Sequence, residues 1–382
     1  MSNLGLGDSV DTIRDPIHGY IGITEYERDL IDTKEVQRLR DITQLGATDR
    51  VYPSATHDRF LHSIGVMHLA GKLGDSLGLT EREITAVRIA GLLHDTGHGP
   101  YSHTSENVAE LFGVEHEDLS CEVVDFHSDK IPVDVELVKD AIRGNAEPNI
   151  IAGILDVDRM DYLVRDGYYT GVQHGSISID TLIRFSTLTP DGKVAMEYKG
   201  VPSLNEFLGA RLRMYQAVYT HNSVSAFDVL LRKSLFNYCV DNSVYDLMKS
   251  SESEIHNELL DYNSYVKYMN RDKPNSILEK PRSELDDNII EYLDSHDYNE
   301  IENMIRNNVE DDIEWLYVRT PMNMKKSFST IPIKTKEDKY IELGDYSNLS
   351  TQFKNEYDNT TQFTIYAPSC NKKEILRVFD SI

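Results

Sequence analysis

The segment GLLHDTGHGPYSH, residues 91–103, joins the end of an apolar stretch to three histidines and one aspartate. The residues before it carry apolar side chains at helical spacing, in a stripe broad enough for a buried helix. Thr80 and Glu83 form a capping-box pattern at the start of this helix, and a Gly-x-Gly-Pro run ends it. A buried helix has no packing reason to finish in His94 and Asp95. The doublet therefore predicts a functional site at the end of a rigid support.

Helical patterns dominate residues 25–235 of the 382-residue chain, which is long enough to bury a large core. Besides the helix described above, the segments 58–78, 149–167 and 204–238 are typical of helices. Between them, FSTLTPDGKVAMEYKG (residues 185–200) predicts a hairpin that turns at Pro-Asp-Gly.

Composition shifts towards polar residues from about residue 239. Near the C-terminus, SFSTIPIKT, KYIELGD and QFTIYAPS predict strands, and KKEILRVFDSI predicts a closing helix. We therefore predict a mainly α fold in three parts: a helical core (1–238), a polar helical extension (239–314) and a small C-terminal α/β lobe (315–382).

The charge and the cysteines narrow the classes of function. The formal net charge is −25, which disfavours nucleic-acid binding because a nucleic-acid interface usually needs a basic face. Three widely spaced cysteines form neither a disulfide framework nor a zinc ribbon. No apolar run has the length of a membrane span, and the first residues lack the pattern of a signal peptide. We expect a cytoplasmic protein that does not bind membranes.

Six of the thirteen histidines lie between residues 62 and 116. A single histidine in a helical core is more often structural than a metal ligand, but a cluster of histidines and carboxylates is different. His62, His94, Asp95 and Asp158 offer two imidazoles and two carboxylates, which suit a divalent Mn, Fe, Zn, Ni or Mg ion with open positions for water and substrate. A cation would also make the buried carboxylates tolerable.

Five segments then occur in a fixed order: DPIHGYIGI (15–23), QRLRDITQLG (37–46), HDRFLHSIGV (57–66), LLHDTGHGPYSH (92–103) and DVDRMDYLVRD (156–166). Together with the H…HD…D spacing they resemble the deoxynucleoside triphosphate triphosphohydrolase branch of the HD-domain metal-dependent phosphohydrolases. That branch includes the vertebrate SAM-and-HD-domain enzyme and bacterial dGTPases. The resemblance covers residues 12–235, with a weaker match at FTIYAPSCNKKEILRVF (363–379). It implies an HD-domain helical core that converts a dNTP and water into a deoxynucleoside and triphosphate.

The resemblance also implies roles for individual residues. The metal ligands are His62, His94, Asp95 and Asp158. The general acid is His116, with His98 and His103 near the phosphate, and Glu106 stands where the family commonly has an aspartate that orients a catalytic histidine. The residues expected to hold substrate are Arg59 and Arg159 at the phosphates (Arg159 where a lysine is usual), Tyr162 and Asp166 at the sugar, Gln44 and Leu45 lining the sugar pocket, and Tyr215 and Gln216 at the base.

A second nucleotide site is a hypothesis that rests on Asp32, Gln37 and Arg40, because the vertebrate relative uses the corresponding residues at a subunit interface. The basic residue expected before DPIHG is not evident, and only Arg14 stands next to the motif. Family precedent implies a homo-oligomer, either a tetramer or a dimer. The family includes enzymes of dNTP-pool control and of antiviral dNTP depletion.

Two other readings stay open. The first is a different HD phosphoesterase, such as a cyclic-nucleotide or oligonucleotide phosphodiesterase or a nuclease. The second is a nucleotide sensor with a catalytically dead site. The acidic charge and the Tyr162–Asp166 pair favour the dNTP reading over a nuclease, and the full set of candidate ligands disfavours a dead site.

Overall fold

The computed structural model describes residues 9–173, 177–310, 313–320, 330–347, 356 and 362–381, and the fold is mainly α, as predicted. The first half contains β1 (Asp11–Asp15), β2 (Gly19–Ile23), α1 (Glu25–Ile31), α2 (Lys34–Arg38), η1 (Leu39–Asp41), η2 (Gly46–Arg50), α3 (Arg59–Leu77), α4 (Glu81–Leu93), α5 (His103–Glu110), α6 (His116–Phe126), η3 (Ser128–Lys130), α7 (Val135–Ile142), α8 (Val157–Thr170) and α9 (Ile179–Phe185).

The second half continues with β3 (Ser186–Leu188), β4 (Val194–Glu197), η5 (Tyr198–Gly200), α10 (Val201–Met214), η6 (Tyr215–Tyr219), α11 (Asn222–Asp241), α12 (Val244–Lys249), α13 (Glu252–Leu259), α14 (Asn263–Met269), β5 (Ser276–Pro281), η7 (Arg282–Glu284), α15 (Asp287–Ser295), α16 (Tyr298–Asn308), β6 (Tyr317–Arg319), β7 (Pro332–Lys334), β8 (Tyr340–Glu342), α17 (Leu343–Tyr346), β9 (Gln362–Tyr366), η8 (Ser369–Asn371) and α19 (Lys372–Phe379).

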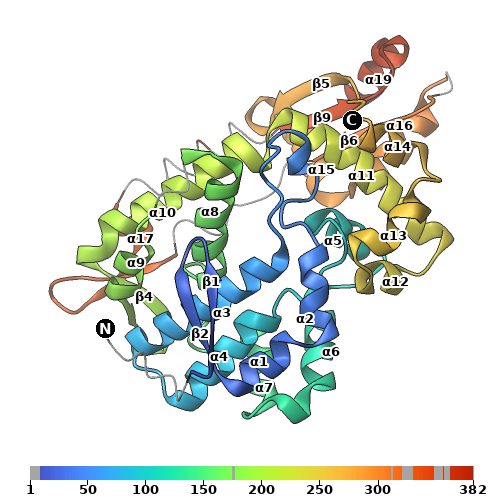
Figure 1. The fold of residues 1–382 in the computed structure, drawn as a ribbon. Helices are drawn as coiled ribbons and strands as arrows, with labels where there is room; N and C mark the ends of the chain where they lie inside the picture. Colours follow the sequence, from blue (N-terminus) through green and yellow to red (C-terminus); the bar gives the residue numbers. More distant parts are fainter. Residues whose placement is uncertain are drawn as a thin grey trace.

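Helices α3, α4 and α8 form the centre of the main core; in Figure 1, α3 and α4 lie in the lower half and α8 lies above α3. α3 and α4 pass very close to each other, because a Cβ on Gly91 would lie 2.9 Å from the backbone nitrogen of Met67. Such close packing leaves little freedom of movement at the C-terminal end of α4. The residues that follow α4 are therefore held by a rigid support.

Local capping signals set the helix ends. The predicted capping box of Thr80 and Glu83 is confirmed at the start of α4, and Asp58 caps α3 by accepting from Leu61 N. The prediction of a helix over residues 149–167 was wrong at its N-terminal end. Helix α8 begins only at Val157, because Asp156 in extended conformation caps it.

The chain from 204 to 238 is also less regular than predicted. Helix α10 passes into a π-helical turn (η6), and α11 starts anew after His221, whose side chain accepts from Ser223 N. Among the described residues, none of the helices is long and apolar enough to cross a membrane.

In the part of the chain that the structure describes, three small sheets accompany the helices: β1–β2, β3–β4–β7–β8 and β5–β9–β6. The predicted hairpin at 185–200 is confirmed as β3 and β4. The predicted strands of the C-terminal part are confirmed at β7, β8 and β9, and the closing helix is confirmed as α19; residues 327–329 of the first predicted strand lie outside the described residues.

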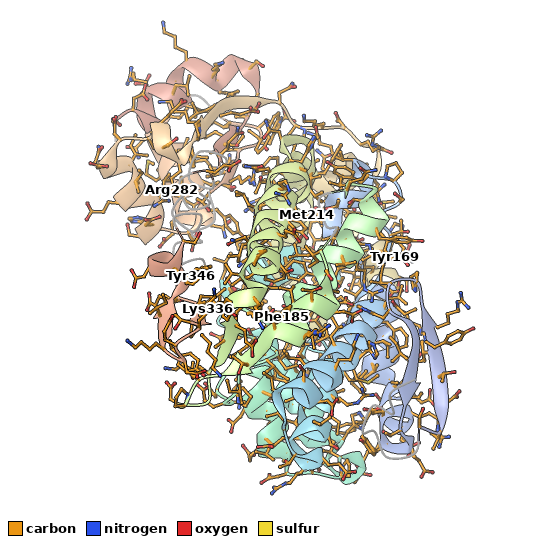
Figure 2. All side chains as sticks on the ribbon, turned by 90° about the vertical axis from the view of Figure 1, so that its left-hand side faces the viewer. Tyr169, Phe185, Met214, Arg282, Lys336 and Tyr346 are labelled. Atoms are coloured by element: carbon orange, nitrogen blue, oxygen red, sulfur yellow. The ribbon has the colours of Figure 1, made fainter. Side chains whose placement is uncertain are left out.

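Pairing with strands far away in the sequence places β7 and β8 in one sheet and β9 in another. β7 pairs in parallel with β4, so it belongs to a sheet of the main core, whereas β9 pairs with β5 and β6 in an upper lobe with α19. In Figure 2, Lys336 lies between Tyr346 and Phe185, whereas Arg282 lies higher, above Tyr346. The division at 238/239 and 314/315 stays a prediction, and β5, a strand within 239–314, was not anticipated.

Candidate metal centre and its surroundings

The four predicted ligands come together from three helices. His62 lies in the first turn of α3, His94 and Asp95 follow α4, and Asp158 lies in the first turn of α8. His62 Nε2 is 2.9 Å from Asp158 Oδ1 and 3.7 Å from Asp95 Oδ2. His94 Nε2 is 3.2 Å from Asp95 Oδ1 and 3.9 Å from Asp158 Oδ1. These spacings suit donor atoms around one shared ion.

The hydrogen bonds of the two imidazoles test whether a metal fits. His62 Nδ1 is 2.8 Å from Asp161 Oδ2, and His94 Nδ1 is 2.9 Å from the carbonyl of Gly91. Both acceptors require a proton on Nδ1, so the neutral form of each ring has a lone pair on Nε2. These Nε2 atoms face the carboxylates of Asp95 and Asp158. His94 Nε2 is buried and has no hydrogen-bond partner among the described residues. A lone pair directed at carboxylate oxygens is unfavourable unless a proton or a metal cation lies between them, and the donor set fits a divalent metal.

A buried charge network behind His62 was not assigned from the sequence. Asp161 accepts from His62 Nδ1, from His18 Nε2 at 2.6 Å and from Arg165 Nε at 2.8 Å. Burial alone raises the pKa of Asp161, but Arg165 and the hydrogen bonds hold it well below the usual range. Arg165 also donates to Asp15 Oδ2 at 2.8 Å. A carboxylate that is always ionised thus fixes the ring of His62.

The same network gives a physical role to the first sequence motif. Asp15 Oδ1 accepts from the backbone nitrogens of Ile17 and His18, both at 2.8 Å, and so shapes the turn after β1. This turn carries His18 to Asp161, 143 residues away in the chain. The order of the motifs was visible in the sequence, but this contact between the first and the last was not.

Gly65 allows α8 to approach α3. A Cβ at this position would lie 1.9 Å from Asp161 Oδ1 and 2.6 Å from Arg165 Nη2. Every larger residue would push α8 outward or displace the Asp161 carboxylate. Glycine at residue 65 is therefore a condition for the support of His62.

Arg59, the first residue of α3 and three residues before His62, is buried beside the candidate ligands. Its Nη1 donates to Asp95 Oδ2 and its Nε donates to Ser102 Oγ at 2.7 Å. Burial raises the pKa of Asp95, but the charge of Arg59 and the neighbouring imidazoles hold it well below its usual value. Arg59 Nη2 is buried and has no hydrogen-bond partner among the described residues. It is a donor suited to an anionic oxygen.

Backbone strain lies next to this arginine. Tyr101 and Ser102 have φ values of 63° and 55°, which non-glycine residues rarely adopt. Ser102 Oγ donates to the carbonyl of Thr43 while it accepts from Arg59. The strained turn therefore places the hydroxyl that orients the guanidinium.

His116 and Glu106 form a pair on one side of the metal ligands. His116 Nδ1 is 2.7 Å from Glu106 Oε1, and His103 Nδ1 is 2.6 Å from Glu106 Oε2. Burial lowers the pKa of His116, but the hydrogen bond and charge of Glu106 outweigh it and raise the pKa. Nitrogen atoms of His98 and His116 and an oxygen of Asp95 lie within 4.8 Å of one another. His116 can thus hold a proton close to the metal ligands.

His98 stacks on His116, with ring centroids 4.0 Å apart. Burial, together with the charges of Arg59 and His116, keeps the pKa of His98 well below its usual value. His98 is therefore neutral. His103 differs from the buried His98 in that its side chain is mostly exposed. Gly97 permits this packing, because its Cβ would lie 2.0 Å from the carbonyl oxygen of His116.

Some residues predicted to bind substrate already have protein partners. The Arg159 guanidinium turns back to Asp156 Oδ2 and the carbonyl of Gly153. Asp166 is buried and accepts from His57 Nε2 at 2.8 Å and from Tyr219 OH at 2.5 Å. These bonds occupy both oxygens of Asp166.

The predicted sugar and base residues lie around Tyr219. Its ring meets the ring of Tyr162 edge to face at 6.2 Å and that of Tyr215 at 5.1 Å. Gln216 Nε2 donates to Glu356 at 3.2 Å. Tyr219 was missed in the sequence, although it stands only four residues after Tyr215 on a helical segment.

The two residues predicted to line the sugar pocket follow η1. Gln44 is buried, and its Oε1 has no hydrogen-bond partner among the described residues. Leu45 is half-buried and packs against the main core. Their roles towards a sugar stay predictions.

The three residues of the predicted regulatory site lie together around the end of α1 and α2. Gln37 Nε2 donates to the carbonyl of Ile31 at 2.8 Å, and Arg40 Nε donates to Gln37 Oε1 at 2.9 Å. Arg40 also lies 3.5 Å above the ring of Phe60. Asp32 is exposed at the end of α1. Their nucleotide-binding role stays a prediction.

Comparisons with known proteins agree with this geometry. Residues 59–166 match the HD domain, and residues 177–382 match the HD associated region. A Dictyostelium discoideum protein named deoxynucleoside triphosphate triphosphohydrolase SAMHD1 homolog is 37% identical over 246 residues, covering 57% of this chain and 48% of that protein. Human deoxynucleoside triphosphate triphosphohydrolase SAMHD1 is 30% identical over 280 residues, covering 59% of this chain and 44% of the human protein.

The chain spans about half the length of the curated relatives it matches. Two crystal structures share the fold. A phosphohydrolase from Bacteroides thetaiotaomicron has a TM-score of 0.72 at 23% identity, covering 94% of this chain and 99% of that one. A hypothetical protein from Aquifex aeolicus has a TM-score of 0.76 at 24% identity, covering 96% of this chain and 99% of the Aquifex chain. The HD associated region alone covers more than half of the chain, and with the HD domain before it the chain belongs to the family of HD-domain proteins that carry this region.

Proposed function

We propose that this chain is a metal-dependent dNTP triphosphohydrolase, which converts a dNTP or dGTP and water into a deoxynucleoside and triphosphate. One observation carries the proposal: the four ligand side chains have the buried Arg59 donor and the His116–Glu106 pair beside them. Phosphate-ester hydrolysis needs a site for the ion, a cation for the phosphate and a proton for the leaving oxygen. The names of the SAMHD1 relatives support the same substrate class.

In the proposed reaction, His62, His94, Asp95 and Asp158 hold a divalent ion whose identity (Mn, Mg, Fe, Zn or Ni) is open. When bound, such an ion lowers the pKa of water and polarises a phosphoryl oxygen. Asp161 favours the tautomer of His62 with its proton on Nδ1, so that Nε2, which faces Asp158, could coordinate the ion.

Arg59 Nη2 binds an oxygen of the α-phosphate while Nη1 keeps its bond to Asp95. His116 donates its proton to the departing 5′ oxygen, and Glu106 stabilises the protonated ring before transfer. His98 and His103 lie near the phosphates in this proposal. The Arg159 guanidinium reaches the phosphates only after it releases the carboxylate of Asp156.

The sugar lies against Tyr162, with Asp166 as acceptor for the 3′-hydroxyl and Gln44 and Leu45 along the pocket. Because Tyr219 OH already donates to Asp166, the 3′-hydroxyl either displaces it or shares the carboxylate. The base lies towards Tyr215 and Gln216.

Three further parts of the proposal concern regulation and biology. A nucleotide bound at Asp32, Gln37 and Arg40 would modulate activity, and the protein would act as a homo-oligomer, a tetramer or a dimer. The biological role would be dNTP-pool control or antiviral dNTP depletion. Titration of the rate with each dNTP and GTP tests the first point, since a hyperbolic rate indifferent to added nucleotide contradicts it.

Product analysis of the purified protein tests the main proposal. The protein is incubated with Mn²⁺ or Mg²⁺ and, separately, with dNTPs, NTPs, cyclic nucleotides and a single-stranded oligonucleotide. Deoxynucleoside and triphosphate in equal amounts support the proposal. Nucleoside monophosphate, or cleavage of the oligonucleotide alone, identifies another HD phosphoesterase. Binding of dNTP without turnover under every metal identifies a nucleotide sensor. Asp95→Ala is the control for contaminating activity, because it removes a ligand.

A further inference from the structure

Glu252, the first residue of α13, connects the HD associated region to the loops around the candidate metal centre. Its Oε1 accepts from the backbone nitrogen of Thr43 and from Thr43 Oγ1, both at 2.7 Å. The same oxygen accepts from the backbone nitrogen of Tyr101 at 3.2 Å. One carboxylate oxygen therefore holds two loops that are far apart in the sequence.

These two loops enclose Arg59. The carbonyl of Thr43 accepts from Ser102 Oγ, and Ser102 Oγ accepts from Arg59 Nε at 2.7 Å. Tyr101 and Ser102 both have positive φ, so the bond from Tyr101 N to Glu252 holds the strained turn. An unbroken series of hydrogen bonds thus leads from Glu252 to the guanidinium and on to Asp95.

The attachment of α13 does not require this carboxylate. Ser251 and Glu254 form the capping box of the helix. Ile255 and Leu259 bury its apolar face, and Ser253 bonds Asp41. Glu252 is a half-buried carboxyl group, and its withdrawal from water raises its pKa to about 7. Withdrawing a carboxylate from water is costly, which points to a role beyond holding the helix.

We propose that Glu252 is a positioning residue that sets the direction of the Arg59 guanidinium by fixing Thr43 and the Tyr101–Ser102 turn. The proposal rests on the proposed function in one respect, namely that Arg59 binds a phosphate oxygen. It assigns to the HD associated region a part in phosphate binding, although no residue of that region reaches Arg59 directly through these bonds.

A double-mutant cycle tests the proposal without turnover. Calorimetry measures the affinity of the Mn²⁺-loaded protein for inorganic triphosphate in wild type, Glu252→Ala, Arg59→Ala and the double variant. Glu252→Ala is expected to weaken binding roughly 10- to 100-fold, the usual effect of losing a group that orients a site residue. In the Arg59→Ala background, Glu252→Ala should have no further effect. Equal losses in both backgrounds would overturn the proposal.

Two more variants separate positioning from folding. Glu252→Gln keeps an acceptor oxygen in the same place and should bind triphosphate as wild type does. Glu258→Ala removes a carboxylate from the same helix and should change nothing, which controls for charge. A cavity of about 220 Å³ beside Glu252 gives water access to the space left by alanine. If Glu252→Ala nevertheless fails to fold, Glu252→Asp, which withdraws the carboxylate while keeping its charge, enters the same cycle with the same expectation.

The outcome is distinguishable from failure of the proposed function. If no dNTP is hydrolysed but triphosphate binds and the cycle shows coupling, Glu252 positions Arg59 in a phosphate site of another reaction. If dNTPs are hydrolysed and the cycle is additive, the function stands and the role of Glu252 is refuted. A turnover assay adds a second readout, because loss of positioning should raise KM more than it lowers kcat in Glu252→Ala and leave both unchanged in Glu252→Gln.

Discussion

Replacement of Gly65 by alanine should damage the candidate metal centre, although the atoms nearest to the new Cβ belong to Asp161 and Arg165 and not to a predicted ligand. The new Cβ would lie 1.9 Å from Asp161 Oδ1, whereas ordinary contact begins near 3.4 Å. Relief of this overlap needs a displacement of about 1.5 Å between α3 and the Asp161 carboxylate. The bond of 2.8 Å from His62 Nδ1 to Asp161 would then exceed hydrogen-bonding distance.

Two effects of different size follow from this displacement. Overpacking should reduce the free energy of unfolding by about 1–3 kcal/mol. Loss of the group that orients a ligand should weaken Mn²⁺ binding roughly 10- to 100-fold. Denaturant unfolding of the metal-free protein measures the first, and calorimetric titration with Mn²⁺ measures the second.

Gly74→Ala on the same helix is the matched control. Its Cβ would meet only side-chain atoms, Ile84 Cγ1 at 3.2 Å and Leu79 Cδ1 at 3.5 Å. These can move by a few tenths of an ångström, and alanine favours a helix over glycine by about 1 kcal/mol. Gly74→Ala should bind Mn²⁺ normally. If Gly65→Ala also binds Mn²⁺ with wild-type affinity, the proposed support of His62 by Asp161 is refuted.

Three other predictions concern chemistry and stability. His116→Ala should slow turnover by roughly 10²- to 10⁴-fold while calorimetry shows unchanged Mn²⁺ binding, and unchanged turnover would remove His116 from the mechanism. Glu106→Gln should shift the alkaline limb of the pH–rate profile to lower pH. Glu106 raises the pKa of His116, so loss of the Glu106 carboxylate lets His116 lose its proton at lower pH. A limb that stays in place would contradict the role of His116 as the acid. Removal of metal by a chelator should lower the thermal midpoint, by the equivalent of about 2.7 kcal/mol relative to protein at a metal concentration 100 times Kd, and no such shift should occur in Asp95→Ala.

The candidate ligands that the sequence predicted share a local signature. His94 and Asp95 stand at the end of an apolar helix, and His62 and Asp158 each stand in the first turn of another, so their chemistry was visible in short segments. The capping signals likewise predicted the start of α4. These features depend on the preferences of a few neighbouring residues, and a sequence states such preferences directly.

The parts that were missed depend on contacts between distant segments. His18 and Asp161 stand 143 residues apart, and β4 pairs with β7 through Met196 and Ile333. No local pattern encodes such a pairing, because many registers satisfy the same alternation of apolar residues. Asp161 did carry one usable signal: it stands three residues after Asp158 in an apolar helix, where an unpaired carboxylate would be costly to bury.

Helix α8 connects the metal centre to the proposed sugar pocket. Asp158 lies beside the other candidate ligands, and Asp161 accepts a hydrogen bond from His62. Arg165 neutralises the charge of Asp161. Asp166 accepts hydrogen bonds from Tyr219 and His57. These residues recur at helical spacing along one element, so their relative positions are set by the helix itself. A displacement of α8 must therefore disturb the candidate metal ligand and the proposed acceptor for the 3′-hydroxyl together. Metal affinity and discrimination between sugars should consequently fall in parallel in variants at the α3–α8 contact, whereas variants of Tyr215 and Gln216, on a different element, should alter base preference and leave metal affinity intact.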